Sequence, residues 1–213
     1  QIVSNTLSTA AGVLSMQSLL YAMGIGMGMG LGTAPLAATL NWVIKDGLGQ
    51  LGGVLFASFV NNRFDSDPKR WRLTATIAMD TASFIEMLTP LAPTYFLLIA
   101  SIANVSKNIS FLAASASRAA IHRSFTLQEN LADVTAKTGS QSIISSLIGT
   151  SLGVSLSSLV AWGIVDATIQ YHSTIALYCM LSTTSIAITY WSLRYVTITS
   201  LSTKRLDYLL HHY

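Results

Sequence analysis

The chain has 213 residues, of which 51% are hydrophobic and 10% are charged, and its mean hydropathy is +0.53. Because soluble globular domains carry about 25% charged residues, this composition does not fit an ordinary water-soluble domain. The formal net charge of +3 rests on few charges and indicates anionic lipid headgroups, and not nucleic acid, as a partner.

The charged residues are clustered, so long uncharged runs separate them. These runs cover residues 1–44, 47–62, 87–106, 138–165 and 167–193. A helix needs about 20 apolar residues to cross a bilayer, and several runs reach that length. We therefore expect an all-α fold, with residues 1–213 forming one polytopic transmembrane helical bundle of about six spans. Because the start Gln1-Ile2-Val3 has neither an initiator Met nor signal-peptide features, we expect a core fragment of a longer protein.

Proline, glycine and the charge clusters divide the chain into predicted helices. In chain order these cover residues 3–23, 35–60, 71–89, 92–123, 131–165 and 168–196. The polar connection around Pro68 follows the second helix, and the short turn at Pro90 makes an antiparallel hairpin of the third and fourth. Six spans place every basic residue except Lys45 and Lys107 on one side, which is the asymmetry typical of membrane proteins.

The run GIGMGMGLG, residues 24–32, lies between the first two predicted helices and raises the question of a phosphate-binding loop. A dinucleotide fingerprint needs glycine at its first, third and sixth positions, and the sixth position is never glycine here. No Gly-Lys-Ser or Gly-Lys-Thr follows, as a P-loop requires. The four-residue spacing of Gly24, Gly28 and Gly32 instead favours close helix packing or a break between two spans.

The same spacing recurs in the second and fifth predicted helices, where we expect Gly49 and Gly53, and Gly149 and Gly153, to pack closely against other helices. The last pair also encloses Ser151 in a Gly-x-Ser-x-Gly pattern. A nucleophile elbow needs a strand before this serine, whereas a predicted helix surrounds it. We therefore expect no catalytic residue and no enzyme.

Charged residues inside predicted spans are the most informative feature, because an unpaired charge there is penalised by several kcal/mol. They are Lys45, Asp46, Asp80, Glu86 and Lys107, and we expect them to face the bundle interior. With Pro90 at the hairpin centre, Asp80 lies within reach of Lys107 and the two are expected to pair. Asn104 shares the helical face of Lys107.

Two more neighbours complete the predicted set. In the same hairpin register, Glu86 is expected to face Tyr95. Lys45 and Asp46 point about 100° apart on a helix, so we expect that they cannot neutralise one another and that at least one needs a further partner.

These residues support two interpretations, and both stay open at this stage. One is a binding pocket or pathway for a small polar solute, formed by Lys45, Asp46, Asp80, Asn104 and Lys107. The other is a buried polar network that fixes the register of the helices.

At the basic boundary, Arg118 and His122 lie one helical turn apart and Arg123 follows. We interpret them as contacts for anionic lipid headgroups. The other histidines are distant along the chain and the single Cys179 has no base beside it, so we expect no metal site and no cofactor.

Residues 33–50, TAPLAATLNWVIKDGLGQ, resemble the core signature of the root UVB sensitive family. The similarity continues through KRWRL at residues 69–73, RAAIH at residues 118–122 and NLADVTAKTGSQ at residues 130–141. Such long collinear runs are specific, and together they extend over at least residues 24–158.

The resemblance implies an integral membrane protein whose plant relatives are linked to seedling development, the ultraviolet-B response and vitamin B6 homeostasis, several of them in plastids. We expect a protein of a plastid or other organelle membrane that binds or transports a small polar metabolite related to vitamin B6. The alternative is a non-enzymatic membrane scaffold that forms a homo- or hetero-oligomer with a related family member, using its glycine-rich faces as contacts.

Overall fold

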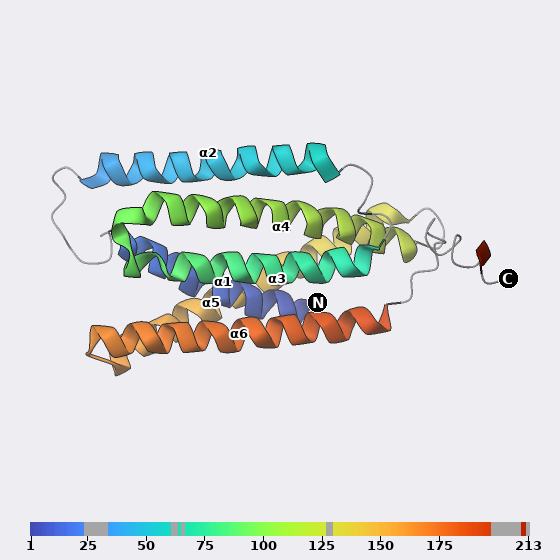
Figure 1. Ribbon diagram of the computed structural model, residues 1–213. Helices are drawn as coiled ribbons and strands as arrows, with labels where there is room; N and C mark the ends of the chain where they lie inside the picture. The colour runs from blue at the N-terminus through green and yellow to red at the C-terminus, as the bar shows by residue number, and fades with distance from the viewer. Residues whose placement is uncertain (24–33, 61–63, 65–66, 127–129, 197–209, 212–213) are drawn as a thin grey trace.

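The chain folds into long helices in the computed structural model, which describes residues 1–23, 34–60, 64, 67–126, 130–196 and 210–211 (Figure 1). The helices are α1 (Ile2–Ala22), α2 (Ala34–Val60), α3 (Pro68–Met87), α4 (Phe96–Ser124), α5 (Leu131–Gly163) and α6 (Ala167–Tyr195). The all-α prediction is confirmed, and each predicted helix is present. Gly24, Gly28 and Gly32 lie outside the described residues.

Side-chain caps fix two of the helix starts. Asp67 accepts a hydrogen bond from the backbone N–H of Arg70 at 3.3 Å, and Pro68 occupies the first turn of α3. Proline is well suited to that position because the N–H it lacks has no partner in a helix anyway. The sequence prediction took Pro68 as part of a loop and started this helix three residues late. Asp166 caps α6 in the same way, accepting from the N–H of Thr168 at 2.8 Å.

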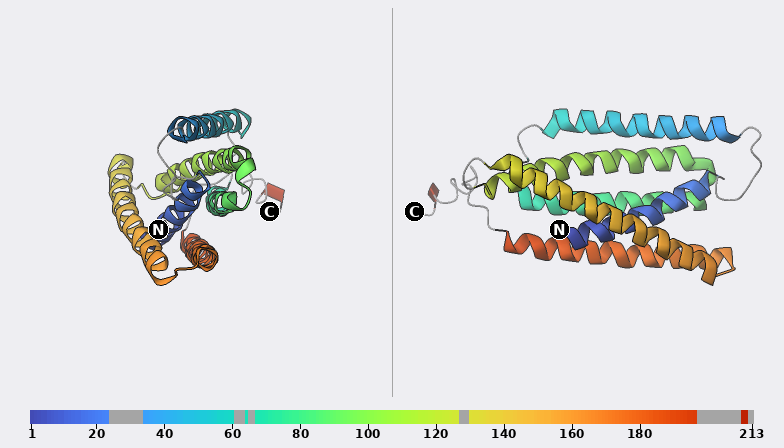
Figure 2. Two further views of the ribbon diagram at one scale, coloured as in Figure 1. Left: turned by 90° about the vertical axis from the view of Figure 1, so that its left-hand side faces the viewer. Right: turned by 180° about the vertical axis from the view of Figure 1, so that it is seen from behind.

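Consecutive helices run in alternating directions, and α1 lies at the centre of the bundle (Figures 1 and 2). It packs against α3, α5 and α6, while α3 also packs against α4. The helix α2 lies on the outside, where its packing partner is α4 (Figure 2). The charged residues of α2 can therefore meet those of α4 but are distant from α6.

Small residues allow the close approach of the helices. A Cβ atom on Gly149 would lie 2.5 Å from the backbone oxygen of Thr6, and one on Gly153 would lie 2.8 Å from the Cβ of Val13. These two glycines are where α5 crosses α1 obliquely (Figure 2). Gly49, Gly52 and Gly53 face α4 in the same way. Small residues at helix contacts are characteristic of membrane bundles, in which close backbone packing replaces the hydrophobic drive between helices.

Hydroxyl groups add hydrogen bonds between helices. Ser4 of α1 lies 2.5 Å from the hydroxyl of Thr189 and 3.2 Å from that of Ser185, both on α6. Ser157 of α5 donates to the side-chain oxygen of Gln17 in α1 at 2.5 Å. Serine hydroxyls therefore join α1 to α6 and to α5.

The outer surface is apolar along α2 and α5. Exposed side chains on these two helices include Leu51, Val54, Phe59, Ile143, Leu147 and Leu159. Within the described residues, the helical segments Thr39–Val60, Pro93–Ser124 and Leu131–Gly163 are long and apolar enough to cross a bilayer. These segments are the greater part of α2, α4 together with the short 3-10 turn before it, and α5.

Candidate functional site

A lysine, a carboxylate and an amide meet between α2 and α4. Lys45 donates to Oδ1 of Asp46 at 2.7 Å, and Asn104 of α4 donates to the same oxygen at 3.0 Å. Asn104 also lies 3.1 Å from the backbone oxygen of Lys45. The expectation that Lys45 and Asp46 cannot neutralise each other is wrong, because the flexible lysine stem bends back toward its neighbour. The predicted additional partner does exist, and it is Asn104.

Two further residues support this contact. The ammonium of Lys45 lies 4.4 Å from the centre of the Trp42 ring, a cation–π contact that helps to stabilise a desolvated charge. Gly49, one turn from Lys45, leaves room for the amide of Asn104. The lysine is well covered, with 5% of its side chain exposed, whereas 41% of the Asp46 side chain is exposed. The carboxylate of Asp46 is therefore the part of this group that a molecule from outside can reach.

A second contact joins α1, α3 and α4. Lys107 donates to Oε2 of Glu86, and the hydroxyl of Ser15 lies 3.0 Å from the same oxygen. Lys107 therefore pairs with Glu86 and not with Asp80 as predicted. The prediction took Pro90 as the centre of a tight hairpin, but residues 88–95 contain two successive 3-10 turns, which change the register between α3 and α4.

Asp80 forms a third, separate contact with α6. Its Oδ2 accepts from the hydroxyl of Ser182 at 2.9 Å, and its backbone oxygen accepts from the hydroxyl of Tyr178 at 2.5 Å. Asp80 is buried, and no Lys or Arg of the described segments forms an ion pair with it. Hydroxyl groups of α6 therefore take the place of the predicted cation.

The five predicted pocket residues thus divide into separate groups. Lys45, Asp46 and Asn104 lie together, Lys107 lies one turn along α4 from Asn104, and Asp80 lies at the contact with α6. Ser15 and Ser182 complete the set and were not predicted. Since serine is frequent throughout these apolar helices, no sequence signal distinguishes these two from the others.

The structure also describes Ser151 and His122, which the sequence had raised as further candidates. Ser151 lies in the middle of α5, where its hydroxyl donates to the backbone oxygen of Leu147 at 2.9 Å. That geometry is an ordinary helical one and lacks the strand that precedes a nucleophile elbow. His122 is buried near the end of α4, and its Nε2 has no hydrogen-bond partner in the part of the chain that the structure describes.

Fold and site together define an all-α bundle of long helices, of which α2, α4 and α5 are apolar enough to cross a bilayer, with ionisable residues buried between the helices. The chain matches the family model described as the vitamin B6 photo-protection and homoeostasis domain over residues 1–213. It is 31% identical over 201 residues to Protein root UVB sensitive 3 and 32% identical over 213 residues to Protein root UVB sensitive 4, both of Arabidopsis thaliana. The chain belongs to the root UVB sensitive family.

The similarity covers 94% and 100% of this chain, but the chain spans only 43% and 40% of the length of those two relatives. Protein root UVB sensitive 2, chloroplastic, from the same plant is 37% identical over 153 residues, which are 72% of this chain and 34% of that protein. No solved structure matches the chain.

Proposed function

We propose that the chain is the membrane-embedded part of a protein that binds a small polar solute related to vitamin B6 and moves it across a bilayer. The length and hydropathy of α2, α4 and α5 support this. Because α1, α3 and α6 run alongside them in alternating directions, we propose that all six helices cross. The apolar side chains exposed on α2 and α5 then contact lipid.

The basic residues support one orientation of this bundle. Among the described residues, all Lys and Arg except Lys45 and Lys107 lie at the end where α3 and α5 begin and α4 and α6 end. This end faces the cytoplasm or its organellar equivalent. The relative named chloroplastic favours a plastid or another organelle membrane.

The solute proposal rests on the carboxylate of Asp46, because one of its two oxygens accepts no hydrogen bond from the described residues. Both hydrogen bonds that it accepts from described residues end on Oδ1, and its side chain keeps 41% exposure. Oδ2 can therefore accept a hydrogen bond from a solute. Vitamin B6 compounds are hydroxylated pyridines, and a carboxylate is a common partner for a pyridine nitrogen that carries a proton.

Binding of pyridoxine to the purified protein in lipid nanodiscs tests this proposal. Asp46→Asn keeps the shape of the side chain but removes the charge, and we expect a loss of affinity of about tenfold or more. The double variant Lys45→Met with Asp46→Asn avoids a buried, unpaired lysine and should bind equally poorly. Asp133→Asn, at an exposed position in the first turn of α5, is the matched control. Unchanged affinity in the folded double variant overturns the proposal.

Association with a related protein is the second candidate, in which the chain acts as a scaffold. The described glycine pairs contact helices of the same chain, so they do not provide the partner surface. The outward face of α2 favours this candidate, because Phe59 is 81% exposed there and the helix packs against α4 on its other face. Light scattering in detergent and in nanodiscs tests it, and a monomer in both rejects a homo-oligomer.

A further inference from the structure

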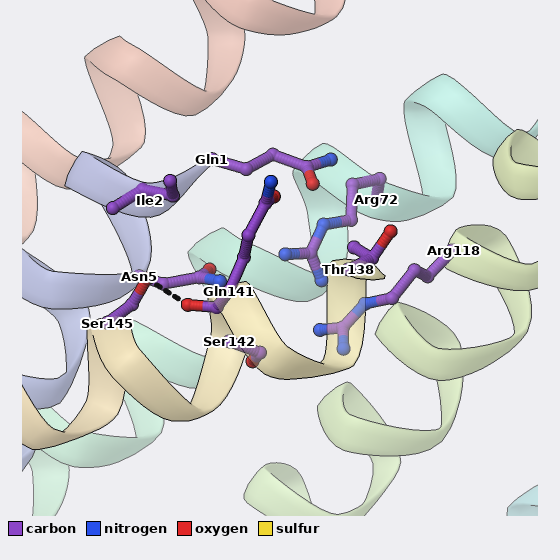
Figure 3. A pocket seen from close by; sticks show the side chains of 9 residues that line it. All are labelled: Gln1, Ile2, Asn5, Arg72, Arg118, Thr138, Gln141, Ser142 and Ser145. Carbon is purple, nitrogen blue, oxygen red and sulfur yellow. Dashed lines mark hydrogen bonds between the residues drawn. The ribbon is translucent and has the colours of Figure 1, made fainter. Parts of the chain in front are cut away.

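Two arginines share a small cavity at the basic end of the bundle (Figure 3). Arg72 comes from the second turn of α3 and Arg118 from the last part of α4. The start of α1 and the first half of α5 complete the wall, with Asn5, Thr138, Gln141 and Ser142. Both guanidinium groups point into the same space (Figure 3).

The charge of this cavity is uncompensated. No Asp or Glu lines it, and among the described residues neither guanidinium forms an ion pair or a hydrogen bond. A guanidinium group carries a positive charge at neutral pH, so the cavity contains two positive charges. Two like charges that face one space repel each other, and this cost falls when an anion lies between them.

Neutral donors stand beside the two cations. The side-chain amides of Asn5 and Gln141 make no hydrogen bond to the described residues. The hydrogen bond from the hydroxyl of Ser145 to Gln141, at 2.6 Å, ends on the backbone oxygen and leaves the side-chain amide available. Arginine presents a planar fork of N–H donors that matches the oxygens of a phosphate. The cavity therefore offers two guanidinium groups and two side-chain amides as donors, and no carboxylate in its lining competes with a phosphate for them.

We infer that this cavity binds a phosphate monoester group, with Arg72 and Arg118 each donating to its oxygens and the amides of Asn5 and Gln141 completing the shell. Two positive charges match a phosphate monoester, which carries about −1.5 to −2 at pH 7, better than they match a carboxylate. The inference uses none of the residues around Asp46, so it stands or falls independently of the proposed function.

The group enters by displacing side chains. The space open to a water-sized molecule is about 10 Å³, which is room for about one water. A phosphate needs more, so the long side chains of Arg72 and Gln141 rotate outward as it binds. The cavity lies at the end where lipid headgroups meet the proposed spans, so the same chemistry is supplied by a lipid headgroup or by a soluble ester.

Glycerol 3-phosphate and phosphatidic acid distinguish these two sources, because both carry a phosphate monoester on glycerol and only the second carries acyl chains. Calorimetry with the purified protein in phosphatidylcholine nanodiscs measures the soluble probe. Native mass spectrometry after mixing with phosphatidic acid measures the lipid. Binding of glycerol 3-phosphate supports a soluble ester, and binding of phosphatidic acid alone supports a headgroup.

Arg72→Gln and Arg118→Gln should each lower the affinity for the bound probe by about tenfold or more. Arg194→Gln, at an exposed position in the last turn of α6, should leave it unchanged. Ligand-induced thermal stabilisation provides a second readout, and without ligand the two variants should unfold at or above the wild-type temperature because one repelling charge is gone. If neither probe binds, or if all three variants bind alike, the inference is overturned.

Discussion

A Cβ atom added to Gly49 would overlap the side-chain amide of Asn104, and it would lie 2.8 Å from the amide nitrogen of Asn108. This close approach is what allows Asn104 to reach both the backbone oxygen of Lys45 and the carboxylate of Asp46. The contact between α2 and α4 and the polar group at its centre therefore depend on the same missing side chain.

Gly49→Ala should destabilise the protein for this reason. Overfilling a packed contact costs about 1–3 kcal/mol, and about 1 kcal/mol lowers the melting temperature of a chain of this size by roughly 2–4 °C. Gly47→Ala is the matched control on the same helix, because a Cβ there meets nothing within 4 Å. That control should be neutral or stabilising, since alanine is about 0.5–1 kcal/mol better than glycine within a helix. Thermal unfolding in detergent measures both, and equal melting temperatures contradict the predicted contact.

Gly149→Ala should cost more than Gly49→Ala. The neighbours of Gly149 include the backbone oxygen of Thr6, whereas those of Gly49 are the ends of flexible side chains. A backbone atom yields only if α1 and α5 move apart, and this weakens the whole contact between the two helices. Gly139→Ala, at an open position on α5, serves as the control. A smaller loss for Gly149→Ala than for Gly49→Ala would show that the crossing of α5 over α1 is looser than described.

Lys107→Met should be strongly destabilising because it leaves the carboxylate of Glu86 buried without its cation. Breaking a buried ion pair from one side costs about 3–5 kcal/mol. The double variant Lys107→Met with Glu86→Gln removes both charges and should recover most of the stability. Unfolding by sodium dodecyl sulfate in mixed micelles gives the free energies for the complete double-mutant cycle. A coupling near zero contradicts the pairing.

Asp80→Asn provides the contrast to that cycle. Asp80 has no cation partner in the described part of the chain, and its Oδ2 accepts only from Ser182. Because an asparagine side chain retains an acceptor oxygen, the substitution removes a buried charge without leaving another one unpaired. We expect the free energy of unfolding to stay within about 1 kcal/mol of wild type or to rise. A loss as large as that of Lys107→Met would indicate that Asp80 has an ionic partner.

The proposal that α3 crosses the bilayer can be tested directly. In a Cys179→Ser background, Arg70→Cys and Thr94→Cys place a thiol at exposed positions on either side of this helix. A membrane-impermeant maleimide applied to sealed vesicles should label them from opposite sides, and Arg123→Cys should behave like Arg70→Cys. Labelling of Arg70→Cys and Thr94→Cys from the same side contradicts six spans.

Most of the fold was predictable because the residues that begin and end its helices can be recognised from the local sequence. The uncharged runs and the glycine and proline residues predict α1 to α6. The errors occur at prolines, because a proline can stand either in the first turn of a helix or in the loop before it. Pro68 is the first residue of α3 and not part of the preceding loop. Around Pro90 and Pro93, two 3-10 turns delay the start of α4 to Phe96, four residues after the predicted start.

The site was less predictable because its partners depend on register between helices. An error of a few residues at the Pro90 turn was enough to assign Lys107 to Asp80 instead of Glu86. The pair Lys45 and Asp46 was missed for a different reason, since backbone direction alone does not describe where a four-carbon side chain ends. Arg72 and Arg118 were both recognised as basic boundary residues, but only the tertiary structure brings them to one cavity.

The two lysine pairs differ in a way that bears on the proposed insertion of the helices into a bilayer. Lys45 and Asp46 are neighbours on one helix, so α2 contains the counter-ion of its own lysine. Glu86 finds its cation on the next helix. If α3 and α4 both cross the bilayer as proposed, the charge of Glu86 is neutralised only when both helices are present, and we expect the two to enter the bilayer together as a hairpin.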